Sequence, residues 1–468
     1  MAEFSRISNY SLLLVSCILL VGFTTPKPEK KLNIIYIHSH DTGWYIQPYG
    51  YDVPTPNMQK LADEGVLFRN HFSTNPTCSP SRGSLLTGRY PISNGLYGLA
   101  HRGFKLNDYN QHIVNFLKKH GYVSALAGVQ HVVDHNNEKA WQIIGYDERI
   151  GGTSSRSDMN NIIAWLENAP EKPFFLSVGF GETHREFPTY NWLEKPDNVN
   201  PPGYLPNVPA TRLDFANYRE SARLLDEKMG MVFKALEDNN LSENTLVICT
   251  TEHGIAFPFM KCNLTDGGIG IMLMMRGPDG LTGGKTVTAL TSNVDIFPTI
   301  CDYLGLEKPD WLQGISFMPV IQDEIEEIRN EVFAEIDYHA SYEPVRCVRT
   351  NRYKYVKRYD GRNKPVLPNC DDGPSKTYLI EQGWQDQNIP REALYDLIFD
   401  PYEKNNLIDD PQNKEFVEDL KSRLKMHMES TNDPLLTKGY VPAPKDALVN
   451  DPDDIDTKGK YIKPKYVM

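Results

Sequence analysis

The sequence has few of the features that mark disulfide-built, repetitive or membrane-spanning proteins. Its 468 residues include only seven cysteines, which are scattered and form no C-x-x-C pair. This spacing excludes a zinc scaffold and a fold built on disulfides, although one disulfide in an oxidising compartment stays open. No internal repeat is visible, and the apolar run from Leu12 to Phe23 is too short to cross a bilayer.

The chain also has no excess of positive charge. Lysine and arginine total 49 against 61 aspartates and glutamates, which gives a formal net charge of −12. Non-specific binding of nucleic acid is therefore not expected, and an anionic substrate must be attracted by a local basic pocket. Hydrophobic residues at 40% and charged residues at 24% are ordinary values for a globular protein.

The N-terminal segment is typical of a secretory signal. Arg6 supplies a positive charge before the apolar run, and Pro26 to Lys31 forms a charged linker after it. We therefore expect residues 1–25 to be a signal peptide and the protein to be periplasmic or secreted. The alternative is a lipoprotein anchored through Cys17, although the apolar residues after Cys17 are atypical of a lipoprotein.

Short apolar runs alternate with amphipathic segments over most of the chain. Leu32 to Ser39 and Pro173 to Phe180 are predicted strands, and Asp214 to Asp238 is a predicted long helix. This alternation predicts an α/β fold in which a mostly parallel sheet is sandwiched by helices. From about Glu331 the pattern changes to charged, strand-like alternation, followed by a predicted helix over Glu415 to Glu429.

Ionisable side chains follow the predicted strands at the points where the strands end. The first strand is followed by His38, His40 and Asp41. Three later strands are followed by His131, by His184, and by the pair Glu252 and His253. Because the carboxyl ends of parallel strands share one edge, where α/β proteins bind ligands, we expect these side chains to meet. The sequence therefore predicts one site built from four separate loops.

The segment Cys78 to Pro91 carries the most specific pattern in the chain. It fits C-x-P-S-R-x-x-x-L-T-G at every specified position, and Pro80 favours a helix that starts close by. Residue 78 is then expected at a helix N-terminus, where free N–H groups and the helix dipole favour an anion. Arg82 lies about one turn further on and can direct its guanidinium to the same point.

This pattern resembles the signature of the type I sulfatases, which belong to the alkaline-phosphatase-like superfamily. In that family a maturation enzyme oxidises the cysteine to formylglycine, so the resemblance implies that Cys78 is modified. It also implies a sulfuric ester hydrolase that acts on sulfate esters or N-sulfates of a sulfated carbohydrate. The run His38 to Gly43 is similar to the branch that contains heparan N-sulfatase and bacterial polysaccharide sulfatases.

The resemblance gives roles to individual residues. Arg82 and Lys261 would stabilise charge on the sulfate, whereas His184 would protonate the leaving alcohol. His131 would assist the formylglycine hydroxyl, although the lysine that the family places nearby is replaced here by Val129. Three weaker candidates for binding a sugar carboxylate or a second sulfate are His101, Arg102 and Arg185.

The same resemblance implies a metal centre, which in this family usually holds calcium. Its ligands would be His40, Asp41, Cys78, Glu252 and His253. His40 and Glu252 stand where the family has aspartates, and two imidazoles favour manganese or zinc over calcium, which prefers oxygen ligands. Either His40 lies outside the metal shell or the metal is not calcium.

The resemblance further implies how the chain is divided. We expect a catalytic domain over 32–330, a small C-terminal subdomain with an antiparallel sheet over 331–433, and an irregular tail over 434–468. The expected partners are the sulfated carbohydrate and a formylglycine-generating enzyme. Nothing in the sequence predicts the oligomeric state.

Two other functions fit the same residues. A phosphodiesterase or phosphonate monoester hydrolase of the superfamily pairs a similar nucleophile with an Asp-His metal site, which His253 supports. A non-catalytic glycan-binding relative would agree with Val129 and with the altered metal ligands, but the intact signature at Cys78 argues against it. Parallel assays with a sulfate ester and a phosphate diester separate these possibilities.

Overall fold

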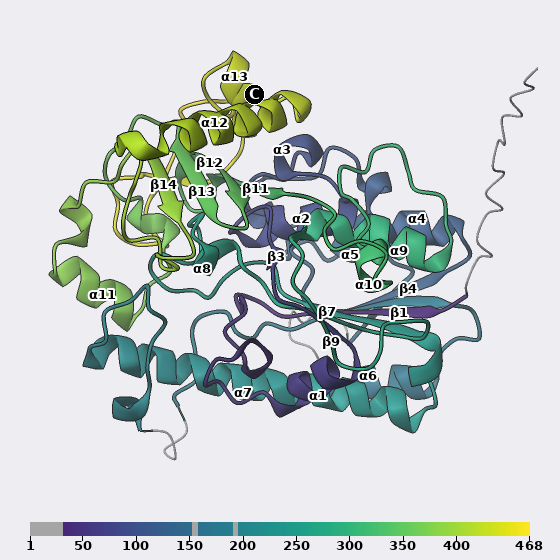
Figure 1. Ribbon diagram of the computed structural model, residues 1–468. Coiled ribbons are helices and arrows are strands. Elements are labelled where there is room, and N and C mark those ends of the chain that lie inside the picture. Colours follow the sequence, from purple (N-terminus) through teal and green to yellow (C-terminus); the bar gives the residue numbers. More distant parts are fainter. Residues whose placement is uncertain (1–30, 152–157, 191–194) are drawn as a thin grey trace, which may run out of the picture.

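The computed structural model describes residues 31–151, 158–190 and 195–468, so the expected signal peptide and Cys17 lie outside the described residues. In the described part, a large sheet is covered by helices on both faces and lies beside a smaller antiparallel sheet (Figure 1). The predicted α/β class and the C-terminal antiparallel sheet are therefore confirmed. Among these residues, no helix combines the length and the apolar character needed to cross a membrane.

The large sheet has, within the described residues, eight strands in the order β5-β4-β6-β1-β7-β8-β2-β9. Their bounds are β1 Asn33–His38, β2 Val66–Phe68, β4 Val123–Gly128, β5 Glu148–Ile150, β6 Phe174–Gly179, β7 Thr245–Thr250, β8 Leu273–Arg276 and β9 Lys285–Val287. Neighbours run parallel except at β8, which is antiparallel to both β7 and β2. A separate two-stranded ladder joins β3 (His71–Phe72) to β10 (Thr291–Ser292).

Helices cover both faces of this sheet because successive residues of each strand point to opposite sides. Ile35 and Ile37 of β1 pack on one face, whereas Ile34 and Tyr36 pack on the other. The first face is covered by α1 (Pro56–Glu64), α6 (Met159–Glu167) and α7 (Pro209–Asp238), and the second by α2 (Cys78–Thr87), α4 (Ile113–Lys119) and α9 (Ile296–Leu304). Burial on both faces explains why residues 34–37 in the middle of β1 are all apolar or aromatic.

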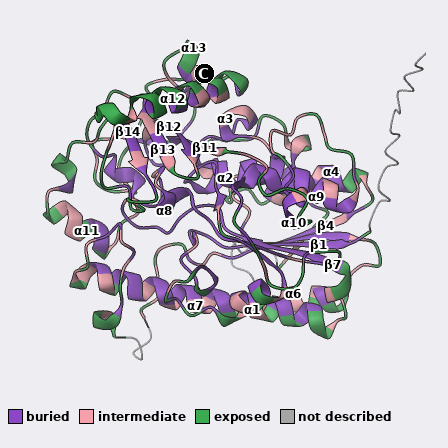
Figure 2. Cartoon of the chain, in the orientation of Figure 1, coloured by how far each residue is buried: buried purple, intermediate pink, exposed green. Residues whose placement is uncertain are grey.

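The central strands β1, β6 and β7 are buried along their whole length, whereas the outer faces of helices such as α7 are exposed (Figure 2). Helix α7 begins earlier than predicted because Pro209 occupies its first turn, where the missing N–H costs nothing. Shorter helices connect the main elements, namely α3 (Pro91–Asn94), α5 (Ala140–Ile144), α8 (Asp266–Ile269), α10 (Met318–Ile321) and α11 (Pro374–Glu381).

Four parallel strands end in register at one edge of the sheet. His38, the last residue of β1, lies beside Gly179 of β6 and Thr250 of β7. Gly128 of β4 lies on the other side of Gly179. The loops that follow these strands therefore leave the sheet at the same edge, as the sequence predicts.

The C-terminal sheet is antiparallel, with strands in chain order. It contains β11 (Glu331–Tyr338), β12 (Tyr342–Thr350), β13 (Tyr353–Arg358) and β14 (Glu392–Asp396). Helix α12 (Lys414–Ser430) packs against it through buried apolar side chains. Residues 434–468 form α13 (Pro434–Thr437) and the ladder β15–β16 (Val449–Asn450 with Tyr461–Ile462), and they bury Val441 and Ala443. All six described cysteines are free thiols.

Candidate active site

The loop after β1 brings His40 and Asp41 to the carboxyl edge of the sheet. Asp41 has a φ of 53°, a left-handed conformation that short polar side chains tolerate, and Gly43 follows with a φ of 56°. Both His40 and Asp41 are buried, and His40 Nδ1 lies 2.7 Å from Asp41 Oδ1. The turn therefore directs an imidazole and a carboxylate to the same point.

The loop after β7 brings Glu252 and His253 to the same place. A Cβ atom at Gly254 would lie 1.9 Å from the Gly267 carbonyl oxygen, so only glycine lets the chain pass here. His253 Nδ1 donates to the Gly254 carbonyl oxygen at 2.9 Å, which leaves Nε2 directed at the site. That Nε2 lies 3.3 Å from Asp41 Oδ1 and 3.3 Å from Cys78 Sγ.

Cys78 is the first residue of α2 and faces these side chains. Its Sγ lies 3.9 Å from Asp41 Oδ1 and 4.0 Å from His40 Nδ1. Burial raises the pKa of the thiol, but the charge of Lys261, together with those of His40 and His253 when these rings are protonated, outweighs it and holds the pKa well below its ordinary value. Together with the helix N-terminus, this environment stabilises negative charge at residue 78.

Each of the two carboxylates offers one oxygen to the centre and the other to a cation. Asp41 Oδ2 lies 2.7 Å from Lys261 Nζ, and Glu252 Oε2 lies 2.9 Å from Arg82 Nη2. Glu252 Oε1 lies 2.7 Å from His40 Nδ1. Burial raises the pKa of Glu252, but Arg82 and His40 lower it to about 2, so Glu252 is ionised at neutral pH.

His40, Asp41, Cys78 and Glu252 each place a donor atom within 4.8 Å of the others, as a divalent cation requires, and His253 lies next to this group. His40 Nδ1 lies 2.7 Å from Asp41 Oδ1 and also 2.7 Å from Glu252 Oε1. His253 Nε2 lies 3.3 Å and 3.7 Å from the same two oxygens. Atoms that bind one ion at about 2.0–2.5 Å lie roughly 3 Å apart, which is close to these separations. The set mixes imidazole nitrogen with carboxylate oxygen, as first-row transition metals and zinc accept.

His131 and His184 border the centre from two other loops. His131 Nδ1 lies 3.1 Å from His40 Nε2, and its ring is within hydrogen-bond reach of Cys78. Burial lowers the pKa of His131 to about 3, so the ring is neutral at pH 7. His184 is 40% exposed, and its Nε2 lies 4.0 Å from Asp41 Oδ2. It can therefore meet a group that enters from solvent.

Lys261 lies between two carboxylates, one of which the sequence analysis did not predict. Its Nζ lies 2.6 Å from Oδ2 of Asp371, a residue of the loop before α11. Burial lowers the pKa of Lys261, but Asp371 and Asp41 raise it well above its ordinary value. Burial raises the pKa of Asp371, but Lys261 and His184 bring it below its ordinary value.

His339 is a second residue that the sequence analysis missed. It directly follows β11, is buried, and is close enough to Lys261, Asp371 and Cys78 for their charges to affect its pKa. Its position after a strand is the same signal that identified the other histidines, although the strand belongs to the C-terminal sheet. Asp371 has no such signal, because it lies in an irregular loop whose place depends on tertiary contacts.

Two predicted substrate-binding arginines are used inside the protein. Arg185 makes a two-pronged ion pair with Asp214, with both N–O distances at 2.7 Å, and its Nε donates to the Ala256 carbonyl oxygen. Arg102 donates to the Asn450 side chain and to the carbonyl oxygens of Ala340, Leu448 and Thr457, so it holds the C-terminal tail. These contacts correct the expectation that the two guanidinium groups bind substrate. His101 stays half-buried, with its ring 5.5 Å from that of His135.

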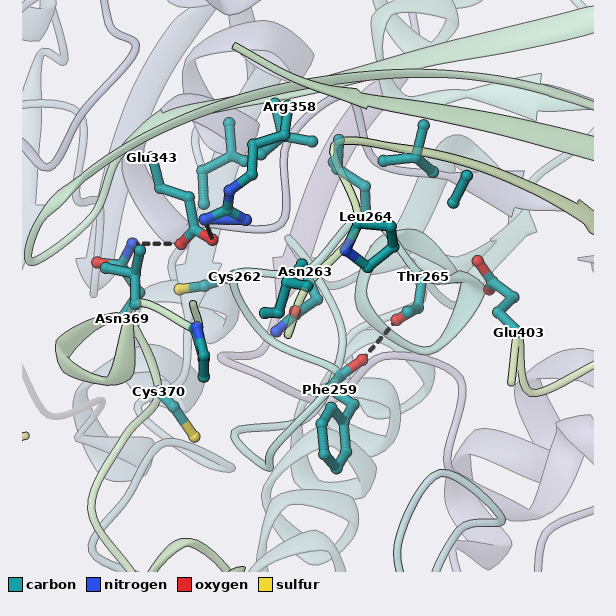
Figure 3. Close-up of a pocket in the computed structure, with 18 of the residues that line it drawn as sticks. Phe259, Cys262, Asn263, Leu264, Thr265, Glu343, Arg358, Asn369, Cys370 and Glu403 are labelled. Carbon is teal, nitrogen blue, oxygen red and sulfur yellow. Dashed lines mark hydrogen bonds and ion pairs between the residues drawn. The ribbon is translucent and has the colours of Figure 1, made fainter. Parts of the chain in front are cut away.

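A cavity of about 170 Å³ lies behind the Lys261 loop, against the C-terminal sheet (Figure 3). Cys262 and Cys370, the neighbours of Lys261 and Asp371, both line it. Two buried carboxylates line it: Glu343 is paired with Arg358 at 2.6 Å and with Asn369 at 2.7 Å, and Glu403 is paired with Lys354 at 3.0 Å. Residues of both loops and of the C-terminal sheet therefore border one cavity, and the charge of Glu343 in it is compensated by Arg358.

Comparisons with known proteins agree with this arrangement. Residues 32–306, more than half of the chain, match the family model described as Sulfatase, and residues 252–389 match the model described as N-sulphoglucosamine sulphohydrolase, C-terminal. The chain is similar to an ulvan-active sulfatase of Formosa agariphila, with 28% identity over 432 residues, 89% of this chain and 83% of that protein. It is 27% identical to human N-sulphoglucosamine sulphohydrolase over 477 residues, 89% of this chain and 93% of that protein.

A solved structure supports the fold. It comes from a study of glycosaminoglycan metabolism by Bacteroides thetaiotaomicron and superposes with a TM-score of 0.67. The similarity covers 88% of this chain and 99% of that chain, at 23% sequence identity.

Proposed function

The chain belongs to the sulfatase family, and we propose that it removes sulfate from a sulfated polysaccharide or from an oligosaccharide derived from one. The observation that carries this proposal is Cys78 at the start of α2, surrounded by Asp41, Glu252, His253 and Lys261. The named relatives, an ulvan-active sulfatase and an N-sulphoglucosamine sulphohydrolase, support a carbohydrate substrate. The test is release of inorganic sulfate from a panel of sulfated glycans, with O-sulfated and N-sulfated sugars assayed separately.

A phosphate diester assayed in parallel tests the second candidate function. The neighbouring Glu252 and His253 favour it, because an acid–histidine pair also occurs in phosphodiesterases of the superfamily. Faster turnover of the diester than of every sulfate would overturn the proposal. Binding of glycans without turnover of either substrate would indicate the non-catalytic alternative.

We further propose that Cys78 is converted to formylglycine by a formylglycine-generating enzyme. Sγ then marks the place of the hydroxyl groups of the hydrated aldehyde, which would supply the nucleophile. Mass spectrometry of the tryptic peptide that ends at Arg82, after co-expression with the maturation enzyme, should show an aldehyde and no thiol. A fully active protein with unmodified Cys78 would overturn this step.

The other side chains would then stabilise charge or transfer protons. Lys261 and the N-terminus of α2 would stabilise negative charge on the sulfate oxygens, whereas Arg82 acts mainly through Glu252. His184, at the solvent side, would protonate the leaving oxygen of the sugar. His131, which has a ring nitrogen within 4.8 Å of Cys78 Sγ, would accept a proton when sulfate departs.

A divalent metal ion held by Asp41, Glu252, His253 and His40 would polarise the sulfate. Calcium is the usual ion of the family, whereas the two imidazoles favour manganese or zinc. Elemental analysis of the purified protein, before and after chelation and reloading, decides between them. Full activity after complete removal of metal would refute the centre.

We also propose that the protein is exported, because Arg6 and the apolar run from Leu12 to Phe23 form a signal-like segment. N-terminal sequencing of the protein from cell fractions should find a chain that begins near Pro26. A chain that retains Met1 in the cytoplasm would contradict export, and a lipid on Cys17 would indicate the lipoprotein alternative.

A further inference from the structure

We propose that Asp371 is a positioning residue for the reaction, which holds the Lys261 ammonium against Asp41 and so fixes where that cation meets the sulfate. The inference rests on the proposed function. Asp371 lies beyond the residues that match the Sulfatase model, so it shows how the C-terminal part contributes to the site.

Lys261 is clamped from two sides. Its side chain is 2% exposed, and Nζ lies 2.7 Å from Asp41 Oδ2 and 2.6 Å from Asp371 Oδ2. A lysine side chain is flexible and carries three N–H donors. Because two donors are used on the carboxylates, the direction of the third is fixed. Without Asp371, Asp41 alone would hold the ammonium, and the long side chain could rotate.

Asp371 is itself held by a loop that is anchored on both sides. Before it, Asn369 donates to Glu343 at 2.7 Å, and after it, Lys376 donates to the Cys370 carbonyl oxygen at 2.8 Å. The Ser375 N–H donates to Asp214 at 3.1 Å. These contacts place the Asp371 carboxylate without help from a substrate.

The same Asp214 also binds Arg185, the residue after His184. A Cβ atom at Gly373 would lie 2.4 Å from Arg185 Nη1, so the two loops are in direct contact. The ion pair between Arg185 and Asp214 therefore ties the loop of His184 to the loop of Asp371. This explains why the guanidinium is used inside the protein.

An alternative role for Asp371 is a direct hydrogen bond to the sugar. Its side chain is only 11% exposed, and Oδ2 is already within 2.6 Å of Nζ of Lys261, which favours action through the lysine. The two roles differ in substrate dependence. A clamp on the sulfate-binding lysine affects every sulfate, whereas a contact to the sugar affects sugar sulfates alone.

The first experiment compares Asp371→Asn with Asp372→Asn. The substitution Asp372→Asn removes the same charge at the next residue. Asp372, however, is 50% exposed and pairs with Lys376, not with Lys261. We expect Asp371→Asn to lower kcat/KM about 100-fold on both a nitrophenyl sulfate and a sugar sulfate, because misplacing a binding group by about 1 Å costs this much. Asp371→Glu should recover part of the loss, and Asp372→Asn should stay near the wild type.

A double-mutant cycle shows whether Asp371 acts through Lys261. In a Lys261→Met background, Asp371→Asn should add little further loss, because the group that it positions is gone. Independent, additive losses would overturn the proposal. So would a loss confined to the sugar sulfate, or equal losses in Asp371→Asn and Asp372→Asn.

Crystal structures of the wild type and of Asp371→Asn give a readout that needs no turnover. We expect Lys261 Nζ to leave its place between the two side chains in the variant, with an unchanged main chain. If the wild type cleaved no sulfate and Nζ still moved, the proposed function would fail while the positioning role stood. An unmoved Nζ in the variant would overturn the positioning role.

Discussion

At the scale of single residues, the site is organised by the two oxygens of each buried carboxylate. In Asp41 and Glu252 one oxygen meets a permanent cation, Lys261 or Arg82, and the other faces the proposed metal centre. The cation compensates the cost of burying the carboxylate, and it also fixes the orientation of the second oxygen. Arg82 is thus best described as a partner of Glu252, and it also donates to the Ser39 carbonyl oxygen.

His253 gives a direct test of the centre. Because its Nδ1 is held by the Gly254 carbonyl oxygen, Nε2 has one direction, which is toward Asp41 and Cys78. We expect His253→Ala to weaken metal binding by at least about 10–100-fold, as loss of an orienting group alone does in other metal sites. Metal titration followed by calorimetry measures this, with His135→Ala as a control, since that histidine is exposed. Equal metal affinity in the two variants would remove His253 from the ligand set.

The activity lost on removing the His184 imidazole should be larger when the leaving group of the substrate is poorer. A sugar alkoxide leaves poorly, and its protonation typically contributes roughly 10²–10⁴-fold, whereas a nitrophenolate needs little help. We expect His184→Ala to lose far more activity on a sugar sulfate than on a nitrophenyl sulfate. Lys261→Ala, which removes a sulfate contact, should impair both. If His184→Ala lost the same factor on both substrates, His184 would bind sulfate and would not act as the acid.

The residues that the strand pattern predicted share one property, which is a position shortly after a buried strand. Asp41, His131, His184 and Glu252 have it, and the register of four strands brings them together. Asp371 lacks this property. Its place depends on its loop, in which Asn369 contacts Glu343 and Ser375 contacts Asp214. The chemistry of Arg185 could not be predicted either, since an arginine that binds an anion and one that pairs with a buried aspartate have the same local sequence.

At the scale of elements, close backbone contact between the loop after β7 and helix α8 shapes the proposed metal centre. Gly254 N donates to the Gly268 carbonyl oxygen at 2.8 Å, and no room remains for a side chain. The glycine after Glu252 and His253 is therefore needed for the position of both ligands. The α/β pattern predicts that this loop exists at the edge of the sheet, but not that it must pack so tightly.

Gly254→Ala should accordingly destabilise the fold. The added Cβ would lie 1.9 Å from a backbone oxygen, so a loop must move, which typically costs about 1–3 kcal/mol or more. Thermal and urea unfolding measure the loss. Gly181→Ala is the matched control, because nothing lies within 4 Å of its added Cβ and no left-handed φ is required. Equal stability of both variants would mean that the β7 loop relaxes at no cost.

At the scale of the whole molecule, buried charges join the C-terminal sheet to the catalytic part. Asp266 at the start of α8 receives Arg349 of β12 at 2.9 Å and Lys354 of β13 at 2.5 Å. Lys354 also pairs with Glu403 at 3.0 Å. The two parts therefore share ion pairs as well as apolar surface, in addition to the contact between Asp371 and Lys261. Removing one partner would leave a buried charge unpaired, which is strongly destabilising.

A second buried cluster is unbalanced in charge. Arg346 of β12 faces Asp337 at 2.9 Å, Asp433 at 2.6 Å and Glu335 at 3.8 Å, and all four side chains are at most 3% exposed. One cation cannot compensate three buried carboxylates. Burial raises the pKa of Glu335 to about 8, with Arg346 opposing this shift and Asp337 and Asp433 adding to it. Burial likewise raises the pKa of Asp337 to about 6.

This cluster predicts that the protein loses stability as the pH rises. Folded Glu335 keeps its proton up to about pH 8, whereas the unfolded chain releases it near its ordinary pKa of 4.5. Unfolding therefore releases a proton between these values, so the stabilisation is complete below about pH 4.5 and is lost as the pH approaches 8. The slope from this one group is at most about 1.4 kcal/mol per pH unit.

Glu335→Gln isolates this effect. The amide keeps an oxygen that can accept from the Ile92 N–H, now at 2.6 Å from Glu335 Oε1, but it has no proton to release. We expect its free energy of unfolding, measured with urea between about pH 5 and pH 8, to fall less steeply than that of the wild type. Glu331→Gln, on the same strand but paired with Arg423 nearer the surface, should follow the wild type. Parallel pH profiles for Glu335→Gln and the wild type would show that Glu335 is ionised in the folded protein, and that Arg346 compensates more than one carboxylate.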